Sequence, residues 1–335
     1  MDMQIVYNSA HKGIFIMRNF LNKHLRSCRK VTDQFFIGFF LAFLLTAFGQ
    51  LFGEGICTRL KVMRFGPTGP VPAWFETGMM YFMFSGIWIL MILVMAIFPK
   101  NREMLKTFGT KLSGNNLKMT LLGCLIGFCT NAFCVAMSIL LKDLSISFYD
   151  FDIVIFLFLL FTVFVQSAAE EIVMRIYFYE KLRRRYRNPL IALLFTSVGF
   201  SVMHVGNPNM TIWGLTQIVI IGLLLAVLVH YYNSTWAAFW VHAIWNFTQS
   251  ILFGLPNSGL VVPYSNFKIN ASSTGFFFDA GNGVEGSPGA CIVIGIALVL
   301  LIVYAKKHDL QPHDLWAAQE AEANELATQR ALLQK

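Results

Sequence analysis

Two adjacent carboxylates and one guanidinium interrupt an otherwise apolar stretch of the sequence. Glu170 and Glu171 are followed by Arg175 within a run that is long enough to cross a bilayer. A charge at the centre of a bilayer costs roughly 2.5–3.5 kcal/mol on insertion scales, so each charge needs a partner or a function. Glu171 and Arg175 are four residues apart on one helix face, where they can pair. Glu170 is rotated by about 100° from Glu171 and is left to another partner.

Two histidines in later apolar stretches could supply that partner. His204 comes four residues after Phe200, and His242 comes four residues before Asn246, so each pair lies on one face of a predicted helix. Counted from the predicted helix ends, Glu170 and these polar residues lie between about 12 and 22 Å deep. A carboxylate, two imidazoles and a carboxamide in one layer are the groups that water activation and oxyanion stabilisation require.

Each pair also has a purely structural interpretation. Glu171 and Arg175 could be an ion pair that only fixes helix register, and for that pair alone this interpretation is favoured. His242 and Asn246 could form interhelical hydrogen bonds, worth about 0.6 kcal/mol per contact. A lone histidine such as His204 is more often a packed core residue than a ligand. The combination at one depth is what favours a catalytic site.

The composition is that of a membrane protein. Of 335 residues, 56% are hydrophobic and 13% are charged, against about 45–50% and about 25% in soluble domains. The formal net charge is +8, but the basic residues form neither one stripe nor one domain, so no nucleic-acid partner is predicted. The six cysteines include no CxxC pair, and we predict neither a disulfide framework nor a cysteine metal site.

Eight apolar stretches are candidates to cross about 30 Å of hydrocarbon as helices. The stretches cover residues 35–53, 77–98, 119–141, 152–180, 190–205, 212–231, 235–254 and 288–305. The sequence therefore predicts an all-α polytopic membrane protein of about eight transmembrane helices, with a catalytic cavity within the bundle. Two glycine pairs, Gly49 with Gly53 and Gly123 with Gly127, have the spacing that lets helices pack closely.

The basic residues predict the orientation of the chain. Twenty of the 26 Lys and Arg residues fall in one set of alternate connections and five in the other, which places both termini in the cytoplasm by the positive-inside rule. The predicted segments are a cytoplasmic basic amphipathic segment (1–33), three transmembrane helices (34–151), a core of transmembrane helices four to seven (152–254), an exterior loop (255–287), a last transmembrane helix (288–305) and a cytoplasmic tail helix (306–335).

Three motifs, in this order and each on a predicted span, resemble those of the CPBP family of intramembrane proteases. That family includes the eukaryotic CAAX prenyl endopeptidases and bacterial Abi or bacteriocin-immunity homologues. The motifs are Glu170-Glu171-x-x-x-Arg175, Phe200-x-x-x-His204 and His242-x-x-x-Asn246, within roughly residues 152–250. Ile176 is a departure, because the family commonly has Gly there, and it could alter helix packing beside the site.

The resemblance implies a role for each motif residue. Glu170, with His204, would hold and deprotonate the water that attacks a peptide carbonyl. His242 and Asn246 would stabilise the oxyanion. The residues that support and orient this site would be Glu171, Arg175 and Phe200.

The resemblance leaves the cofactor open. The family is usually classed as metalloprotease, and Glu170, His204 and His242 could hold zinc. No HExxH motif occurs among the seven histidines. In the alternative, a glutamate-dependent mechanism without metal, the same imidazoles bond the water and the oxyanion directly.

The implied function is an intramembrane endopeptidase acting on a membrane-associated peptide of CAAX-like, leader or bacteriocin and pheromone type. Its partners would be this substrate and the lipid bilayer, and the resemblance favours a bacterial plasma membrane. One alternative is a non-catalytic immunity or scaffold protein that binds a peptide in the same cavity. A proton-coupled transporter is less favoured, because the sequence shows no convincing paired half-helices.

Overall fold

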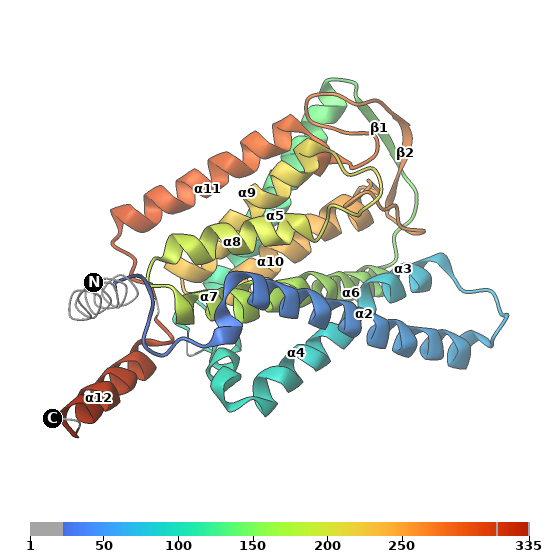
Figure 1. Cartoon of the computed structure of the whole chain (residues 1–335). Helices are drawn as coiled ribbons and strands as arrows, with labels where there is room; N and C mark the ends of the chain where they lie inside the picture. The colour runs from blue at the N-terminus through green and yellow to red at the C-terminus, as the bar shows by residue number, and fades with distance from the viewer. Residues whose placement is uncertain (1–22, 111, 313, 334–335) are drawn as a thin grey trace, which may run out of the picture.

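The computed structural model of the chain describes residues 23–110, 112–312 and 314–333, so most of the predicted 1–33 segment lies outside the described residues. The described chain is mostly helical, as predicted (Figure 1). The α-helices are α2 (Phe35–Phe65), α3 (Ala73–Phe82), α4 (Ser85–Ile97), α5 (Leu117–Leu140), α6 (Ile153–Glu171), α7 (Tyr179–Arg185), α8 (Pro189–Val202), α9 (Ile212–Tyr231), α10 (Thr235–Asn246), α11 (Pro288–Lys307) and α12 (Ala317–Leu333).

Shorter elements connect these helices. Two π-helices, η3 (Ile172–Phe178) and η4 (Phe247–Leu252), continue α6 and α10. The 3-10 turns are η1 (Val31–Asp33), η2 (Pro99–Phe108) and η5 (Val284–Gly286). One antiparallel sheet pairs β1 (Leu144–Phe148) with β2 (Phe267–Ser272), an addition to the predicted all-helical fold. This sheet ties the 255–287 loop to the connection between α5 and α6.

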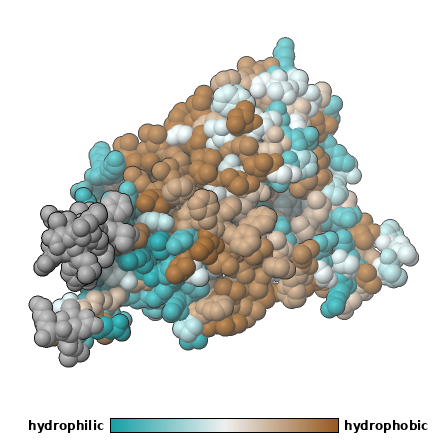
Figure 2. Space-filling model, in the orientation of Figure 1, coloured by the Kyte–Doolittle hydropathy of each residue, from teal (hydrophilic) through white to brown (hydrophobic). Residues whose placement is uncertain are grey.

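Among the described residues, six helical segments are long and apolar enough to cross a membrane. They are Phe35–Phe65, Ala73–Ile97, Leu117–Leu140, Ile153–Arg185, Ile212–Tyr231 and Pro288–Lys307. Hydrophobic side chains form a broad band over the visible face of the bundle, with hydrophilic residues gathered toward its ends (Figure 2). These features indicate an integral membrane protein whose spans are helices, in agreement with the predicted architecture.

The predicted count of eight spans is not confirmed. The stretch 190–205 forms α8, which has 14 residues and a length of about 21 Å, short of a hydrocarbon core of about 30 Å. The helix ends at Val202 because the next residues form turns, with the N–H of His204 donating to the carbonyl of Ser201. The stretch 235–254 forms α10, which has 12 residues and is lengthened by η4.

Polar side chains at helix starts fix where the site-bearing helices begin. The carboxylate of Asp152 accepts hydrogen bonds from the backbone N–H groups of Val154 and Ile155, and the hydroxyl of Ser234 accepts one from Ala237. Such N-caps satisfy backbone donors that the first helical turn leaves unpaired. Proline at the first position of α8 and α11 removes one such donor altogether.

The two ends of the described chain meet at the same end of the bundle (Figure 1). Arg26 pairs with Asp314, with 2.6 Å between Nη2 and Oδ2. The indole N–H of Trp316 donates to the carboxylate of Glu180 at 2.9 Å, and Trp316 is fully buried. This is the arrangement expected for an even number of membrane crossings.

The predicted glycine pairs lie where helices approach most closely. A Cβ atom at Gly53 would lie 1.6 Å from the carbonyl oxygen of Met83, in the turn before α4, and 3.2 Å from the backbone nitrogen of Gly86 in α4, so only glycine lets α2 pass this close to the start of α4. A Cβ at Gly127 would lie 2.5 Å from the carbonyl oxygen of Val241 in α10. Because α10 carries two candidate site residues, its contact with α5 also positions the site.

Substitution of Gly53 by alanine tests this packing. We expect Gly53→Ala to lower the melting temperature of the detergent-solubilised protein, because the added methyl group forces α2 away from α4 at an overpacking cost of about 1–3 kcal/mol. Gly55→Ala in the same helix is the matched control, because a Cβ there meets nothing within 4 Å. Equal melting temperatures for the two variants would contradict the close contact.

Candidate active site

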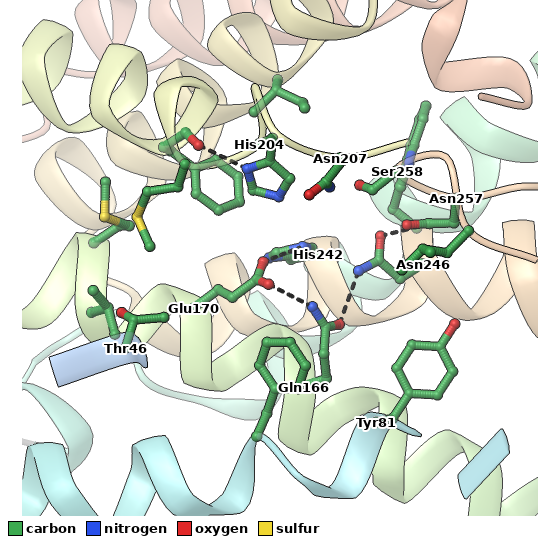
Figure 3. A pocket seen from close by; sticks show the side chains of 18 of the residues that line it. Thr46, Tyr81, Gln166, Glu170, His204, Asn207, His242, Asn246, Asn257 and Ser258 are labelled. Atoms are coloured by element: carbon green, nitrogen blue, oxygen red, sulfur yellow. Dashed lines mark hydrogen bonds and ion pairs between the residues drawn. The ribbon is translucent and has the colours of Figure 1, made fainter. Parts of the chain in front are cut away.

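A cavity of about 430 Å³ lies among the helices and contains the four candidate catalytic residues. Glu170 comes from α6, His242 and Asn246 from α10, and His204 from the turn after α8. The remaining walls come from α2, from α3 and the turn after it, from η3, from the end of α8, from α9 and from the 255–287 loop. Figure 3 shows His204 across the cavity from Glu170, with His242 beside Glu170. The structure thus brings together residues that are up to 76 positions apart in the sequence.

Both helices that carry the site change from α to π geometry immediately after a site residue. α6 ends at Glu171 and continues as η3, which contains Arg175, while α10 ends at Asn246 and continues as η4. Single π-helical turns inside longer helices occur frequently at functional sites. The change re-aims the side chains that follow relative to a regular α-helix.

Glu171 lies at the centre of a buried charge cluster. Its Oε2 atom lies 3.1 Å from Nε of Arg175, and neither side chain is exposed. Its Oε1 atom accepts a hydrogen bond from Nδ1 of His242 at 2.9 Å. This bond joins α6 to α10 and fixes the tautomer of the imidazole, because a carboxylate only accepts. The other ring nitrogen, Nε2, then lies 3.6 Å from Oε2 of Glu170.

Phe200 packs between the two imidazoles and the guanidinium. Its ring centroid lies 4.7 Å from that of His204 and 5.8 Å from that of His242, both edge-on, and 4.6 Å from the guanidinium carbon of Arg175. The carbonyl oxygen of Phe200 accepts a hydrogen bond from Nδ1 of His204 at 2.8 Å. Phe200 and His204, four residues apart, are therefore joined by a hydrogen bond as well as by contact between their rings.

Gln166 is a site residue that the sequence analysis missed. Its Nε2 atom donates to Oε1 of Glu170 at 2.8 Å, and its Oε1 atom accepts from Nδ2 of Asn246 at 3.1 Å and from the hydroxyl of Ser167 at 2.9 Å. The signal that could have found it is its position four residues before Glu170, inside an apolar run. The glutamine connects the candidate base with the candidate oxyanion group.

The amide of Gln166 makes the two carboxylate oxygens of Glu170 different, because it binds only one of them. Oε1 is occupied by Gln166, while Oε2 lies toward His242, and the side chain retains 14% of its exposure. A carboxylate held by one oxygen and open at the other is oriented for proton transfer at the open atom. The cavity therefore presents one carboxylate oxygen, two imidazole Nε2 atoms and a nearby carboxamide.

The three residues named as a possible zinc set are not grouped as metal ligands in this structure. Within the described ranges, no group of three or more His, Cys, Asp and Glu side chains is arranged to hold a metal ion. Glu170, His204 and His242 line one cavity, but they do not converge on a common point as zinc ligands would.

Comparison with known proteins identifies the segment that carries the site. Residues 152–248 match the family model described as type II CAAX prenyl endopeptidase, Rce1-like. The match runs from the start of α6 into η4 and contains all three motifs, which confirms the family resemblance expected from them. No curated protein and no solved structure matches the chain.

Removing the central carboxylate charge tests the buried cluster. We expect Glu171→Gln to lower the melting temperature strongly, because breaking a buried ion pair leaves an uncompensated charge on Arg175, at a cost of about 3–5 kcal/mol. The control is Glu76→Gln, which breaks the partly exposed Lys61–Glu76 pair, where Nζ lies 3.8 Å from Oε1. That change should cost less than about 1 kcal/mol. Similar shifts for both variants in thermal unfolding would refute a stabilising role for the cluster.

Proposed function

We propose that the protein is an intramembrane endopeptidase that hydrolyses a peptide bond in a membrane-associated substrate. The observation that carries this proposal is the position of Glu170, which lines a cavity among apolar helices with one carboxylate oxygen held and the other open. The type II CAAX prenyl endopeptidase match supports a protease role at the level of the family. The proposed substrates are peptides of CAAX-like, leader or bacteriocin and pheromone type.

Glu170 acts as the general base in this proposal. A water molecule bound between Oε2 of Glu170 and the imidazole of His204 across the cavity transfers a proton to Glu170 as its oxygen attacks the scissile carbonyl carbon. The C–N bond of the tetrahedral intermediate then breaks, and Glu170 returns the proton to the leaving amine. The carboxylate is regenerated, so the protein is unchanged after one turnover.

His242 and Asn246 stabilise the oxyanion. Glu171 accepts from Nδ1 of His242, so Nε2 points into the cavity beside Glu170, and this atom donates to an oxyanion when the ring is the doubly protonated imidazolium. Asn246 offers its Nδ2 hydrogens, which in the resting site bond to Gln166 and Ser167. A developing negative charge is a stronger acceptor than either neutral oxygen, so it can recruit one of these donors in the transition state.

The proposed setting is a bacterial plasma membrane with both termini in the cytoplasm. The distribution of Lys and Arg supports this orientation. The meeting of Arg26 with Asp314 supports a shared side for the two ends of the chain. A substrate that is itself held at the membrane can reach a cavity between the helices without leaving the bilayer surface.

The decisive variant is Glu170→Gln. We expect cleavage to fall by about 10²–10⁴-fold, because the amide cannot take the proton from water. Folding should be retained, because the new carbonyl oxygen can still accept the hydrogen bond from Gln166. Purified wild-type protein and variant would be incubated with a pool of prenylated and unmodified membrane peptides, and products would be read by mass spectrometry.

Glu54→Gln is the matched control, because Glu54 is an exposed residue of α2 that does not line the cavity. Products that disappear only in Glu170→Gln would support the protease and identify the bond cleaved. Undiminished turnover in Glu170→Gln would sink the proposed mechanism. A folded wild-type protein that binds peptides but gives no Glu170-dependent product would favour the peptide-binding alternative.

A further inference from the structure

We infer that the 255–287 loop completes the active site, with Asn257 as a positioning residue that fixes the amide orientation of Asn246. The inference rests on the proposed endopeptidase function. Nδ2 of Asn257 donates to Oδ1 of Asn246 at 3.1 Å, and both residues line the cavity (Figure 3). Asn257 lies beyond the segment 152–248 that matches the protease family, so the family comparison does not assign it a role.

The contact completes a one-way chain of hydrogen bonds. Asn257 donates to Asn246, Asn246 donates to Gln166, and Gln166 donates to Glu170. The carboxylate at the end can only accept, so each amide before it must present NH₂ toward Glu170 and oxygen toward the loop. The donor that begins the chain is therefore supplied by the loop.

A flipped Asn246 would lose its contacts on both sides. Its oxygen would face the oxygen of Gln166, and its NH₂ group would face that of Asn257. Asn257 therefore keeps the Asn246 donors on the side of the cavity where the water activated by Glu170 attacks. Without this contact, the two amide orientations of Asn246 would differ less in energy.

A short turn of the loop holds Asn257 in place. Asn257 and Leu260 exchange two backbone hydrogen bonds of 2.9 Å, and the carboxylate of Glu285 accepts the backbone N–H of Ser258. Ser258 adopts a left-handed backbone conformation with φ of 47°, an uncommon one for a residue with a side chain. Glu285 is 5% exposed, so its bond to the turn is sheltered from solvent.

The start of the loop is tied to the membrane helices. Nε2 of Gln249, in η4, donates to the carbonyl of Pro256 at 2.5 Å, and its Oε1 accepts from Nδ2 of Asn131 in α5 at 3.0 Å. Both side chains are fully buried. The residue before Asn257 is thus fixed by the same α5 helix that packs against α10. Asn257 and Asn246 are consequently positioned on one framework.

The test replaces Asn257 with an isosteric residue that does not donate when ionised. We expect Asn257→Asp to lower kcat at least about tenfold at neutral pH with little change in KM, because the carboxylate faces an acceptor and disfavours the productive Asn246 orientation. At lower pH the introduced carboxyl becomes protonated and can donate again, so the ratio of variant to wild-type kcat should rise. Asn257→Ala should lower kcat with no such recovery.

The pH comparison uses the ratio because other ionisable groups line the cavity in both proteins. These groups are Glu170, His204, His242, Glu285 and Tyr81, which all line the same cavity. Asn270→Asp is the matched control, since Asn270 is exposed on β2 and its side-chain oxygen accepts from Ser147. It should leave kcat and its pH profile unchanged.

A second readout does not depend on turnover. In protein labelled with ¹⁵N at Asn and Gln side chains, the Asn246 amide protons should exchange slowly with solvent in the wild type and in Asn270→Asp, and faster in Asn257→Asp. Absence of Glu170-dependent cleavage in the wild type would defeat the proposed function, while the exchange rates would still decide whether Asn257 holds Asn246.

Two outcomes would overturn the inference itself. Wild-type kcat and unchanged Asn246 exchange in Asn257→Asp would show that the loop does not position the amide. Equal losses in Asn257→Asp and Asn257→Ala at every pH, accompanied by equal drops in melting temperature, would assign Asn257 to loop stability alone.

Discussion

The buried carboxylate of Glu171 is the constraint on which the rest of the site depends. It is fully buried and needs compensation, which Arg175 supplies from one turn later in the helix and His242 supplies from α10. These contacts form only in one register between α6 and α10. The same register directs the adjacent Glu170 into the cavity, because neighbouring residues on a helix face in different directions. The ion cluster and the candidate base are thus two consequences of one helix pairing.

That pairing in turn depends on the close approach of α10 to α5. Gly123 and Gly127 lie against the backbone of α10, where a Cβ at either position would come within 2.6 Å of a carbonyl oxygen. Lipid surroundings provide little hydrophobic drive between helices, so close packing has to contribute much of the association. One turn after Gly127, Asn131 in α5 reaches the start of the 255–287 loop through Gln249. The helix α5 therefore supports both α10, directly, and the 255–287 loop, through Gln249.

The sequence predicted the features that carry a large energetic signal. Long apolar runs identified the six membrane-length segments, and charges within them identified Glu170, Glu171 and Arg175. Gln166 was not predicted, because placing a neutral amide in an apolar span costs less free energy than placing a charge there. The early end of α8 and the two π-helices were not predicted, because hydrophobicity averaged along a run does not distinguish an α-helix from a turn or a π-helix. The pairing of β1 with β2 joins segments more than a hundred residues apart, which local patterns do not encode.

The smaller desolvation penalty of a neutral amide also accounts for the use of amides beside the candidate base Glu170. A second charge next to Glu170 would either neutralise it or add another desolvation cost, whereas a carboxamide orients it without changing the charge of the cavity. Gln166 takes one carboxylate oxygen and leaves the other toward His242, so the two oxygens become chemically distinct. The orientation of a side-chain amide is not fixed by packing alone, because its oxygen and its NH₂ group differ little in size and shape. A series of hydrogen bonds that ends on a carboxylate fixes the orientation of every amide in it. It therefore fixes the orientation of Asn246, where the proposed reaction requires donors.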